Sequence, residues 1–392
     1  MANNNENKVL NVPHLRFPEF SGEWVTKSIN DLAVVIGGGT PDTTVKSYWD
    51  GEIQWFTPSE IGKNKYVDSS LRTITEVGLN NSSAKLLPPN TILLSSRATI
   101  GECSLSLREC ATNQGFQCLV SKKCNVDFLY YLIQTKKKDL IRKSCGSTFL
   151  EISANEVRKI QVSVPSDVEQ QKIAELLSLI DERIATQNKI IEDLKKLKSA
   201  IIHRCYSSQT NMIPLSELLK QCSDRNRSGS DLQVLSVSNK YGFIAQSNQF
   251  EDREVASDDT SNYKVVKKGM FAYNPARINV GSIALYEMDG NGIVSPMYVC
   301  FTTKSELLPS YLKYYFASQT FKHEMYKRLE GSVRLCLTFE ELCNIEIHLP
   351  SIEQQKNISK YISKIENNLS LVDSIFSKYQ QQRRYLLSQM FI

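Results

Sequence analysis

A Pro-Ser step followed by a glutamine-containing stretch occurs twice in this chain, and this repeat constrains the fold more than any other feature. The two copies are VPSDVEQQKI (164–173) and LPSIEQQKNI (349–358). Aligned backwards from the prolines, segments 146–165 and 331–350 match without a gap, and each opens with Gly-Ser and ends with Pro. A spacing far above the roughly 20–50 residues of solenoid repeats predicts two tandem domains.

The similarity continues towards the N-terminus of each copy. NTILLSSRATIGECSL resembles GMFAYNPARINVGSIAL with one inserted residue, which places Arg97 opposite Arg277 and Gly101 opposite Gly281. Likewise, FLYYLI in the first copy matches YLKYYF in the second. The chain is therefore predicted to contain two copies of one unit, each a globular part followed by a long segment of a different kind.

Each Pro-Ser step begins a segment predicted to be one long helix. Ser166-x-x-Glu169 and Ser351-x-x-Gln354 fit the capping box, in which the Ser hydroxyl accepts from a free backbone N–H and the Glu or Gln side chain reaches back. Apolar residues then recur at alternating steps of four and three, the heptad pattern of a coiled coil. The predicted seam consists of Ile173, Leu177, Ile180, Ile184, Ile191 and Leu194 in the first helix, and Ile358, Ile362, Ile365, Leu369, Val372 and Phe376 in the second.

A helix of this length with an apolar seam needs a partner, and the second copy supplies one. Each helix would be roughly 60 Å long at about 1.5 Å per residue. We predict that the two helices pack together between the globular domains. The alternative, in which each helix packs only on its own domain, stays open.

The predicted fold is of the α+β class, with two similar mixed α/β domains separated by two long helices packed as an antiparallel coiled coil, in a pseudo-two-fold internal repeat. The predicted segments are a first globular domain, a central helix, a second globular domain and a C-terminal helix, at 1–165, 166–208, 209–350 and 351–392. Short apolar runs bounded by Gly, Pro, Asn or Ser predict strands at 53–56, 91–95, 117–120 and 159–164. Amphipathic patterns predict helices over 126–145 and 312–329.

The composition favours a reducing compartment and argues against a metal site. The ten cysteines are scattered without a Cys-x-x-Cys pair, and the four histidines are equally dispersed. Single buried thiols are therefore expected rather than a metal cluster. The sequence shows no signal-peptide pattern and no apolar run of about 18 residues, so we expect a cytoplasmic protein. The net charge of +5 is mild and does not by itself indicate nucleic-acid binding.

Three short motifs resemble parts of enzyme sites, and none is complete. VVIGGGTP lacks the Lys-Ser/Thr of a phosphate-binding loop and the helix start that a dinucleotide or S-adenosylmethionine loop requires. NPAR lacks the second Pro and the aromatic residue of the base-gripping loop of amino-methyltransferases. The acidic-x-Lys triplet Asp193-Leu194-Lys195 lies on a predicted long helix, where a nuclease site is not expected. An autonomous restriction nuclease or methyltransferase with an unrecognised site stays an alternative, as does a coiled-coil adaptor without a DNA role.

The order of globular domain, capped helix, globular domain and capped helix resembles the specificity subunit of type I restriction–modification systems over essentially the whole chain. The duplicated Gly-Ser, Pro-Ser and Glu-Gln-Gln-Lys blocks and the opening VPHLRFPEFSGEWVTKSINDLA carry the resemblance. It implies a non-catalytic reader of double-stranded DNA, in which each target recognition domain reads one half of a bipartite site. The helices would set the gap between half-sites and dock two methyltransferase subunits. S-adenosylmethionine, ATP and Mg would belong to those partners and to restriction subunits with translocase activity, and this chain would hold no cofactor.

Candidate DNA-contacting residues follow from the side chains that usually read bases, namely Arg, Lys, Asn, Gln, Ser and Thr on loops or helix starts. Arg97 and Arg277 are favoured because they occupy matching positions, although a structural ion pair would explain the match equally well. Segment 209–350 has a net charge of −1, so we expect weak DNA binding by the chain alone, falling steeply with salt. The candidates are Lys63, Lys65, Arg97, Thr99, Asn113, Gln114, Ser147 and Thr148 in the first half, and Asn274, Arg277, Asn279, Ser332 and Arg334 in the second.

Overall fold

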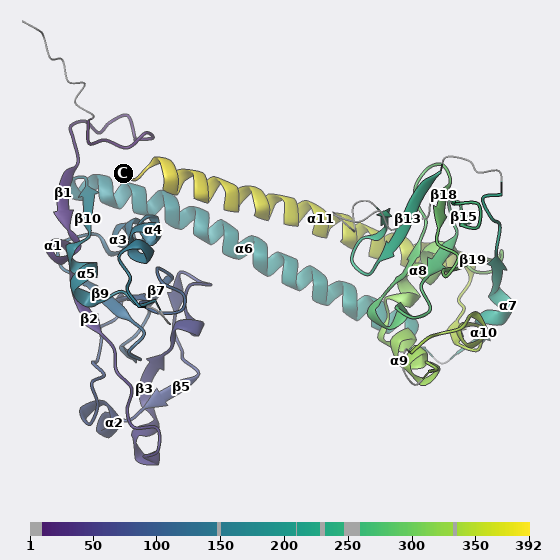
Figure 1. The fold of residues 1–392 in the computed structure, drawn as a ribbon, viewed down its shortest axis with the longest axis horizontal. Helices are drawn as coiled ribbons and strands as arrows, with labels where there is room; N and C mark the ends of the chain where they lie inside the picture. The colour runs from purple at the N-terminus through teal and green to yellow at the C-terminus, as the bar shows by residue number, and fades with distance from the viewer. Residues whose placement is uncertain (1–9, 147–149, 209, 228–231, 247–258, 332–334) are drawn as a thin grey trace, which may run out of the picture. The chain divides into compact units, whose positions relative to one another are not determined.

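The computed structural model describes residues 10–146, 150–208, 210–227, 232–246, 259–331 and 335–392. The chain forms two compact units: unit 1 consists of Met1–Asn188 with Ser374–Ile392, and unit 2 consists of Lys189–Asp373. Two long helices, α6 (Asp167–Tyr206) and α11 (Ile352–Gln389), each contribute residues to both units (Figure 1). The two long helices predicted from the heptad pattern are confirmed.

The globular part of unit 1 contains three small sheets. The largest has the strand order β2-β9-β6-β7-β4, the second has the order β5-β3-β8, and the third pairs β1 with β10. The strands predicted at 53–56, 91–95, 117–120 and 159–164 correspond to β3, β6, β9 and β10. The bounds are β1 Val25–Ser28, β2 Ala33–Gly37, β3 Trp49–Phe56, β4 Tyr66–Val67, β5 Arg72–Ile74, β6 Ile92–Leu94, β7 Cys103–Ser106, β8 Cys110–Thr112, β9 Gln117–Ser121 and β10 Gln161–Val164.

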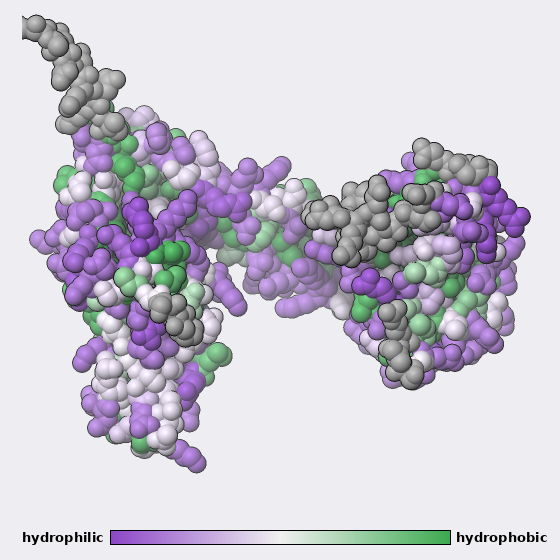
Figure 2. Space-filling model, in the orientation of Figure 1, coloured by the Kyte–Doolittle hydropathy of each residue, from purple (hydrophilic) through white to green (hydrophobic). Residues whose placement is uncertain are grey.

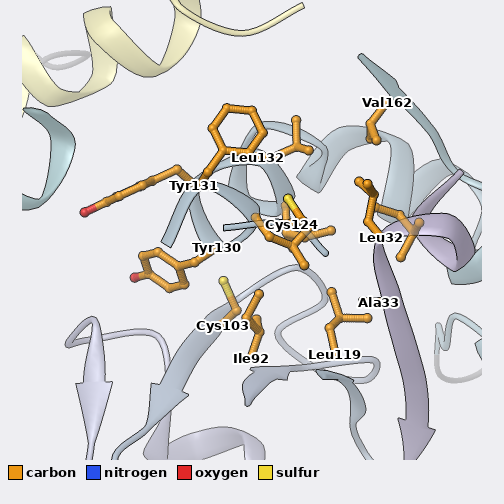
Figure 3. Close-up of a cluster of buried hydrophobic side chains, with 14 of the residues drawn as sticks. Leu32, Ala33, Ile92, Cys103, Leu119, Cys124, Tyr130, Tyr131, Leu132 and Val162 are labelled. Atoms are coloured by element: carbon orange, nitrogen blue, oxygen red, sulfur yellow. The ribbon is translucent and has the colours of Figure 1, made fainter. Parts of the chain in front are cut away.

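The core of unit 1 forms where α3 covers its largest sheet. Ile92 and Leu119 from the sheet and Leu132 from α3 are completely buried in one cluster (Figure 3). The single helix predicted over 126–145 is wrong in one respect, because Lys136 (φ −90°, ψ 8°) separates α3 from α4. The helices are α1 Ile29–Leu32, α2 Glu76–Asn80, α3 Val126–Thr135, α4 Lys137–Arg142 and α5 Ala154–Lys159.

Unit 2 repeats this plan with two four-stranded sheets, β12-β19-β16-β17 and β14-β13-β18-β15, and the pair β11-β20. The helix predicted over 312–329 is also divided, because the hydroxyl of Ser318 caps a new helix by accepting from the N–H of Phe321 (3.0 Å). The strands are β11 Met212–Pro214, β12 Leu219–Cys222, β13 Gln233–Ser238, β14 Gly242–Ala245, β15 Lys264–Val266, β16 Phe271–Tyr273, β17 Ile283–Leu285, β18 Gly292–Val294, β19 Val299–Thr303 and β20 Glu346–His348. The helices are α7 Leu215–Leu218, α8 Pro309–Phe316, α9 Gln319–Lys327 and α10 Phe339–Cys343.

A buried glutamine explains why the Pro-Ser stretch is repeated. In unit 1, the Gln170 side chain donates to the carbonyl of Pro165 (3.0 Å) and accepts from the N–H of Asn125 (3.0 Å), the N-cap of α3. In unit 2, the Gln355 side chain donates to the carbonyl of Pro350 (2.9 Å) and accepts from the N–H of the residue that caps α8 (2.9 Å). The motif therefore fixes the start of each long helix to the start of a core helix.

The two predicted capping boxes have different outcomes. The hydroxyl of Ser351 accepts from the N–H of Gln354 (3.4 Å), whose side chain accepts in return from the N–H of Ser351 (3.1 Å). The reciprocal half of the first box is wrong. Both carboxylate oxygens of Glu169 accept hydrogen bonds from Arg16 and Trp24 rather than from the backbone of Ser166.

The cysteines lie apart as free thiols. Within the described residues, no group of His, Cys, Asp and Glu could hold a metal ion, and no helix is long and apolar enough to cross a membrane. Burial raises the pKa of several thiols to about 12, well above the usual value: Cys103, Cys110, Cys118, Cys124 and Cys300.

Candidate nucleic-acid interface

One edge of unit 1 gathers loops from distant parts of the sequence. Gly39 N–H, after β2, donates to the carbonyl of Thr112 (2.8 Å), and Asn113 N–H donates to the last residue of β3 (3.1 Å). The turn between β6 and β7 joins the same group because Ser96 N–H donates to the carbonyl of Gly115 (2.8 Å). Backbone hydrogen bonds therefore hold polar loops together at the ends of several strands, the usual place for recognition residues on a rigid scaffold.

The glycines of VVIGGGTP serve this close approach. A Cβ on Gly38 would lie 2.0 Å from the carbonyl oxygen of Asn113, and a Cβ on Gly39 would lie 2.3 Å from the backbone nitrogen of Ala84. Both distances are below any normal van der Waals contact, so only glycine fits at these positions. The motif is thus explained by packing between loops.

Arg97 and Thr99 lie in the turn between β6 and β7. Arg97 forms an ion pair with Glu151 (2.8 Å), and the two side chains are 42% and 36% exposed. A pair this exposed contributes only about 0–1 kcal/mol to stability. The structural ion pair that was the alternative explanation for the match between Arg97 and Arg277 is therefore present in unit 1. It orients the guanidinium and adds little to the stability of the fold.

Asn113 and Gln114 lie on the neighbouring loop between β8 and β9. The Asn113 side chain accepts from the N–H of Gly115 (2.8 Å), and the hydroxyl of Thr40 donates to the exposed Gln114 side chain. Through Ser96 and Gly115, this loop and the turn that carries Arg97 belong to one loop group. The structure thus brings together four of the predicted contact residues.

A second hairpin borders this loop group. Cys145 and Glu151 exchange backbone hydrogen bonds (2.9 and 3.0 Å), and Ile152 N–H donates to the carbonyl of Ser96 (3.1 Å). The predicted contact residues Ser147 and Thr148 lie outside the described residues. They stay predictions.

Unit 2 contains the same two hairpins. Asn274 N–H donates to the carbonyl of Ser282 (3.1 Å), as the corresponding residue of the β6–β7 turn does in unit 1, and Gly281 has a positive φ of 93°. Glu330 and Cys336 exchange backbone hydrogen bonds (3.0 and 2.8 Å), matching the hairpin of unit 1 at the same offset that separates the two Pro-Ser steps. The predicted upstream repeat is therefore present as matching backbone geometry.

The first hairpin of unit 2 carries Asn274, Arg277 and Asn279. Arg277 is exposed, and Asn274 and Asn279 are half-buried. Asn274 accepts from the N–H of Ala276 (3.1 Å), which ties its side chain to the turn. The other predicted residues of this unit, Ser332 and Arg334, lie outside the described residues and stay predictions.

Lys63 and Lys65 have different environments. Lys63 is exposed on its loop. The Lys65 side chain is only 8% exposed and forms an ion pair with Asp127 (2.6 Å), donates to Ser178 (2.7 Å) and lies 4.9 Å from the ring centroid of Tyr131. These contacts give Lys65 a structural position in unit 1, whereas Lys63 keeps the access that a phosphate contact needs.

The seam residues of α6 and α11 all have low exposure. The first residues of the α6 seam lie in the core of unit 1 together with Leu386 and Met390, at the C-terminal end of the chain. Correspondingly, Ile362 of α11 lies in the core of unit 2 with Ile202 and Tyr206 of α6. Each helix therefore packs on globular cores and on its partner helix. The buried members are Ile173, Leu177, Ile180, Ile191, Ile362 and Ile365, and the half-buried members are Ile184, Leu194, Ile358, Leu369, Val372 and Phe376.

Two polar contacts between the long helices were not predicted. In unit 1, Arg383 donates to Asp181 (2.5 Å), which also accepts from the hydroxyl of Tyr131 (2.8 Å). Figure 3 shows the Tyr130 and Tyr131 hydroxyls leaving the core cluster on the same side. Burial is the main reason that the pKa of Tyr131 is raised, so its hydroxyl stays a donor.

Unit 2 contains the equivalent set. Lys198 donates to Glu366 (2.5 Å), which also accepts from the hydroxyl of Tyr314 (2.9 Å). The sequence does contain a signal for both groups of contacts: Lys198 and Arg383 interrupt the apolar heptad pattern at equivalent positions of the repeat. A cation at a seam position predicts an acidic partner across the helix pair, and here both acidic partners, Asp181 and Glu366, are half-buried.

A family model described as the type I restriction modification DNA specificity domain matches residues 21–196 and 228–375. The MjaIX specificity subunit of Methanocaldococcus jannaschii is 39% identical over 180 residues, which cover 45% of this chain and 42% of that protein. The EcoR124I/EcoR124II specificity subunit of Escherichia coli is 31% identical over 190 residues, which cover 46% of each chain. The chain thus spans less than half the length of these two curated relatives.

Two solved structures share the fold over nearly the whole chain. A type I restriction–modification S subunit from M. genitalium has a TM-score of 0.61 at 16% identity and covers 97% of this chain and 99% of that one. A chain from a study of complex assembly and conformational transition of the type I R-M system has a TM-score of 0.58 at 14% identity, with coverages of 95% and 98%. At these identities the likeness concerns the fold alone.

Proposed function

The chain belongs to the type I restriction–modification DNA specificity family, and from this we propose that it is the DNA-reading subunit of a type I complex. Each globular part reads one half of a bipartite site in double-stranded DNA. The chain itself performs no catalysis, and it directs methyltransferase subunits to the adenines of that site. The two alternatives, an autonomous enzyme and an adaptor without a DNA role, lack a supporting observation in the described residues.

The observation that carries the proposal is the pair of hairpins that recurs in both units with partly different side chains, since Arg97 matches Arg277 whereas Thr99 is replaced by Asn279. Arg97 and Thr99 in unit 1 correspond to a turn with Arg277 and Asn279 in unit 2. Side chains of these types donate to and accept from base edges in the major groove. A shared backbone with different polar residues supports two readers of the same kind with different base preferences.

The long helices support the second part of the proposal, that α6 and α11 set the spacing of the half-sites and dock the modification subunits. Half-site spacing in DNA-binding proteins follows from the geometry that connects the readers. Both helices carry an apolar seam, and an ion pair joins them within each unit, which supports this role. On the face shown in Figure 2, the described surface is largely hydrophilic with scattered hydrophobic residues.

The cofactors of the reaction belong to the partners in this proposal. S-adenosylmethionine would be held by the modification subunits, and ATP and Mg by restriction subunits that translocate DNA. In this proposal, the chain itself supplies the loops that contact DNA and binds no cofactor. Its mild net charge of +5 supports a reader that gains affinity within a complex and loses affinity steeply as salt concentration rises.

The experiment that tests the proposal compares modified adenines in cells with and without this gene, and identifies the proteins that co-purify with the tagged chain. We expect a methyltransferase to co-purify, and one split methylated motif to disappear on deletion. An unchanged pattern of adenine methylation together with no methyltransferase partner would overturn the proposal. Restoring the gene is the matched control.

A further inference from the structure

The segment Leu10–Glu23, here called the N-terminal strap, lies across the start of α6 and the end of α11 in unit 1. Arg16 donates to both carboxylate oxygens of Glu169 (2.7 and 2.8 Å), whose side chain is only 2% exposed. The hydrogen bond to Glu169 is the main reason that the pKa of Arg16 is raised. Such a bidentate charged contact is among the stronger hydrogen bonds in proteins.

Three further positions hold the strap. The N–H of Leu15 donates to the carbonyl of Gln389 (2.9 Å), and the hydroxyl of Ser163 donates to the side chain of Asn11 (2.9 Å). Lys172 lies 4.9 Å from the ring centroid of Phe17 and pairs with a carboxylate of the strap. The strap therefore contacts Ser163, Glu169, Lys172 and Gln389.

The internal repeat identifies the same four positions in unit 2. At the offset that superimposes the two Pro-Ser steps, they are His348, Gln354, Asn357 and Arg204. All four line one groove with a volume of about 660 Å³, together with Ile358 and Tyr361, among others. We call this surface the α11 groove.

The α11 groove is exposed where its counterpart is covered. Tyr361 is 66% exposed, whereas its counterpart Leu176 packs against the core of unit 1. Only residues 207–211 join α6 to β11, a connection too short to form a second strap. Within the described residues, the chain offers no segment in unit 2 that corresponds to the strap.

We propose that the α11 groove binds a loop or peptide segment of a partner protein that carries an aromatic and an acidic side chain. The strap is a loop whose ends are joined by the hydrogen bond from the N–H of Trp24 to the carbonyl of Asn11 (2.8 Å), and it shows that this geometry accepts a loop segment with aromatic side chains. The charges differ between the two grooves, because Glu169 and Lys172 are replaced by the neutral Gln354 and Asn357, while Arg204 adds a cation. The groove therefore disfavours the arginine of the strap and favours a carboxylate.

This inference goes beyond the proposed function, because the groove lies outside the hairpins proposed to contact DNA and its test requires no DNA. The probe is a fluorescent peptide of residues 10–23 with Arg16→Glu, measured by fluorescence anisotropy with the full-length chain. In unit 1 the new carboxylate of this probe would face Glu169, so the probe disfavours the groove that the strap already covers. The control peptide also replaces Phe17 and Phe20 by Ser.

We expect saturable binding of the Arg16→Glu peptide and none of the control peptide. Tyr361→Ala or Arg204→Glu in the protein should each weaken binding about tenfold, the effect of losing one well-placed interface residue. Tyr385→Ala is the matched control, because Tyr385 is also exposed on α11 (57%) but lies in unit 1, and it should leave binding unchanged. No saturable binding of the Arg16→Glu peptide, equal binding of both peptides, or binding that is insensitive to Tyr361→Ala and Arg204→Glu would each overturn the proposal. Loss of DNA reading with intact peptide binding would contradict only the proposed function.

Discussion

Replacing Arg97 by Ala separates the two explanations of this residue, base contact and structural ion pair. Arg97 forms an ion pair with Glu151, and both side chains are at least one-third exposed. After discounting for solvent screening, that pair contributes about 0–1 kcal/mol to folding. A bidentate contact with a guanine contributes about 1–3 kcal/mol of discrimination, which corresponds to roughly 5–150-fold in affinity.

The assay uses the chain assembled with its modification subunits and competing duplexes in which one half-site at a time is replaced. We expect Arg97→Ala to weaken recognition of one half-site by about 1–3 kcal/mol and to leave the other unchanged, with little change in melting temperature. Glu151→Gln is the matched control, because it breaks the same ion pair but keeps the guanidinium. If Arg97 reads a base, Glu151→Gln retains or increases affinity, because a carboxylate near the DNA is removed.

Two results would refute this reasoning. Equal losses for Arg97→Ala and Glu151→Gln would show that the ion pair itself holds the loop, and that Arg97 does not contact a base. Equal losses at both half-sites would show a general effect on assembly or on phosphate binding. In either case, Arg97 would be a positioning residue for the hairpin.

Three other predictions concern the scaffold. Ile184→Asp puts a charge on the half-buried seam and should prevent normal co-purification with modification subunits; normal assembly would contradict the seam. Gln170→Ala and Gln355→Ala each leave buried backbone groups without partners, so each should destabilise its unit by about 2–4 kcal/mol in urea unfolding, and wild-type midpoints would contradict their role. At pH 8, the exposed Cys145 should react with a thiol reagent in the folded protein, whereas thiols whose pKa is raised to about 12 should react only after unfolding: Cys103, Cys110, Cys118, Cys124 and Cys300.

Those parts of the fold that depend on local pattern were predictable from the sequence. The heptad spacing and the Pro-Ser starts predicted α6 and α11, because a long helix repeats its signal many times. The break at Lys136 was not predictable, because a Lys is compatible with a continuous helix and the break is set by packing in the tertiary structure. The pairing of Glu169 with Arg16, in place of the predicted capping box, was missed for a similar reason. The two residues lie far apart in the sequence, so no local pattern indicated their contact.

The candidate site was less predictable than the fold. Matching the repeat correctly placed Arg97 and Arg277 on equivalent turns, because the backbone of the hairpin is shared. No local pattern indicated that Glu151 would lie beside Arg97, since that contact depends on how two hairpins pack. Lys65 has the positive charge that a phosphate contact requires, but its sequence did not indicate that the side chain is buried and paired with Asp127.

In the proposed function, the ion pairs between the long helices would restrict how the spacing between half-sites can change. Asp181 and Lys198 on α6 have the same separation along the sequence as their partners Arg383 and Glu366 on α11. An insertion of one heptad into α6 alone would move one ion pair out of register with the other, and each helix end would still have to reach its globular core. Matched insertions in both helices preserve both ion pairs and both cores. We therefore expect a change in half-site spacing to require equal insertions in α6 and α11, whereas an insertion in one helix should abolish assembly rather than shift the spacing.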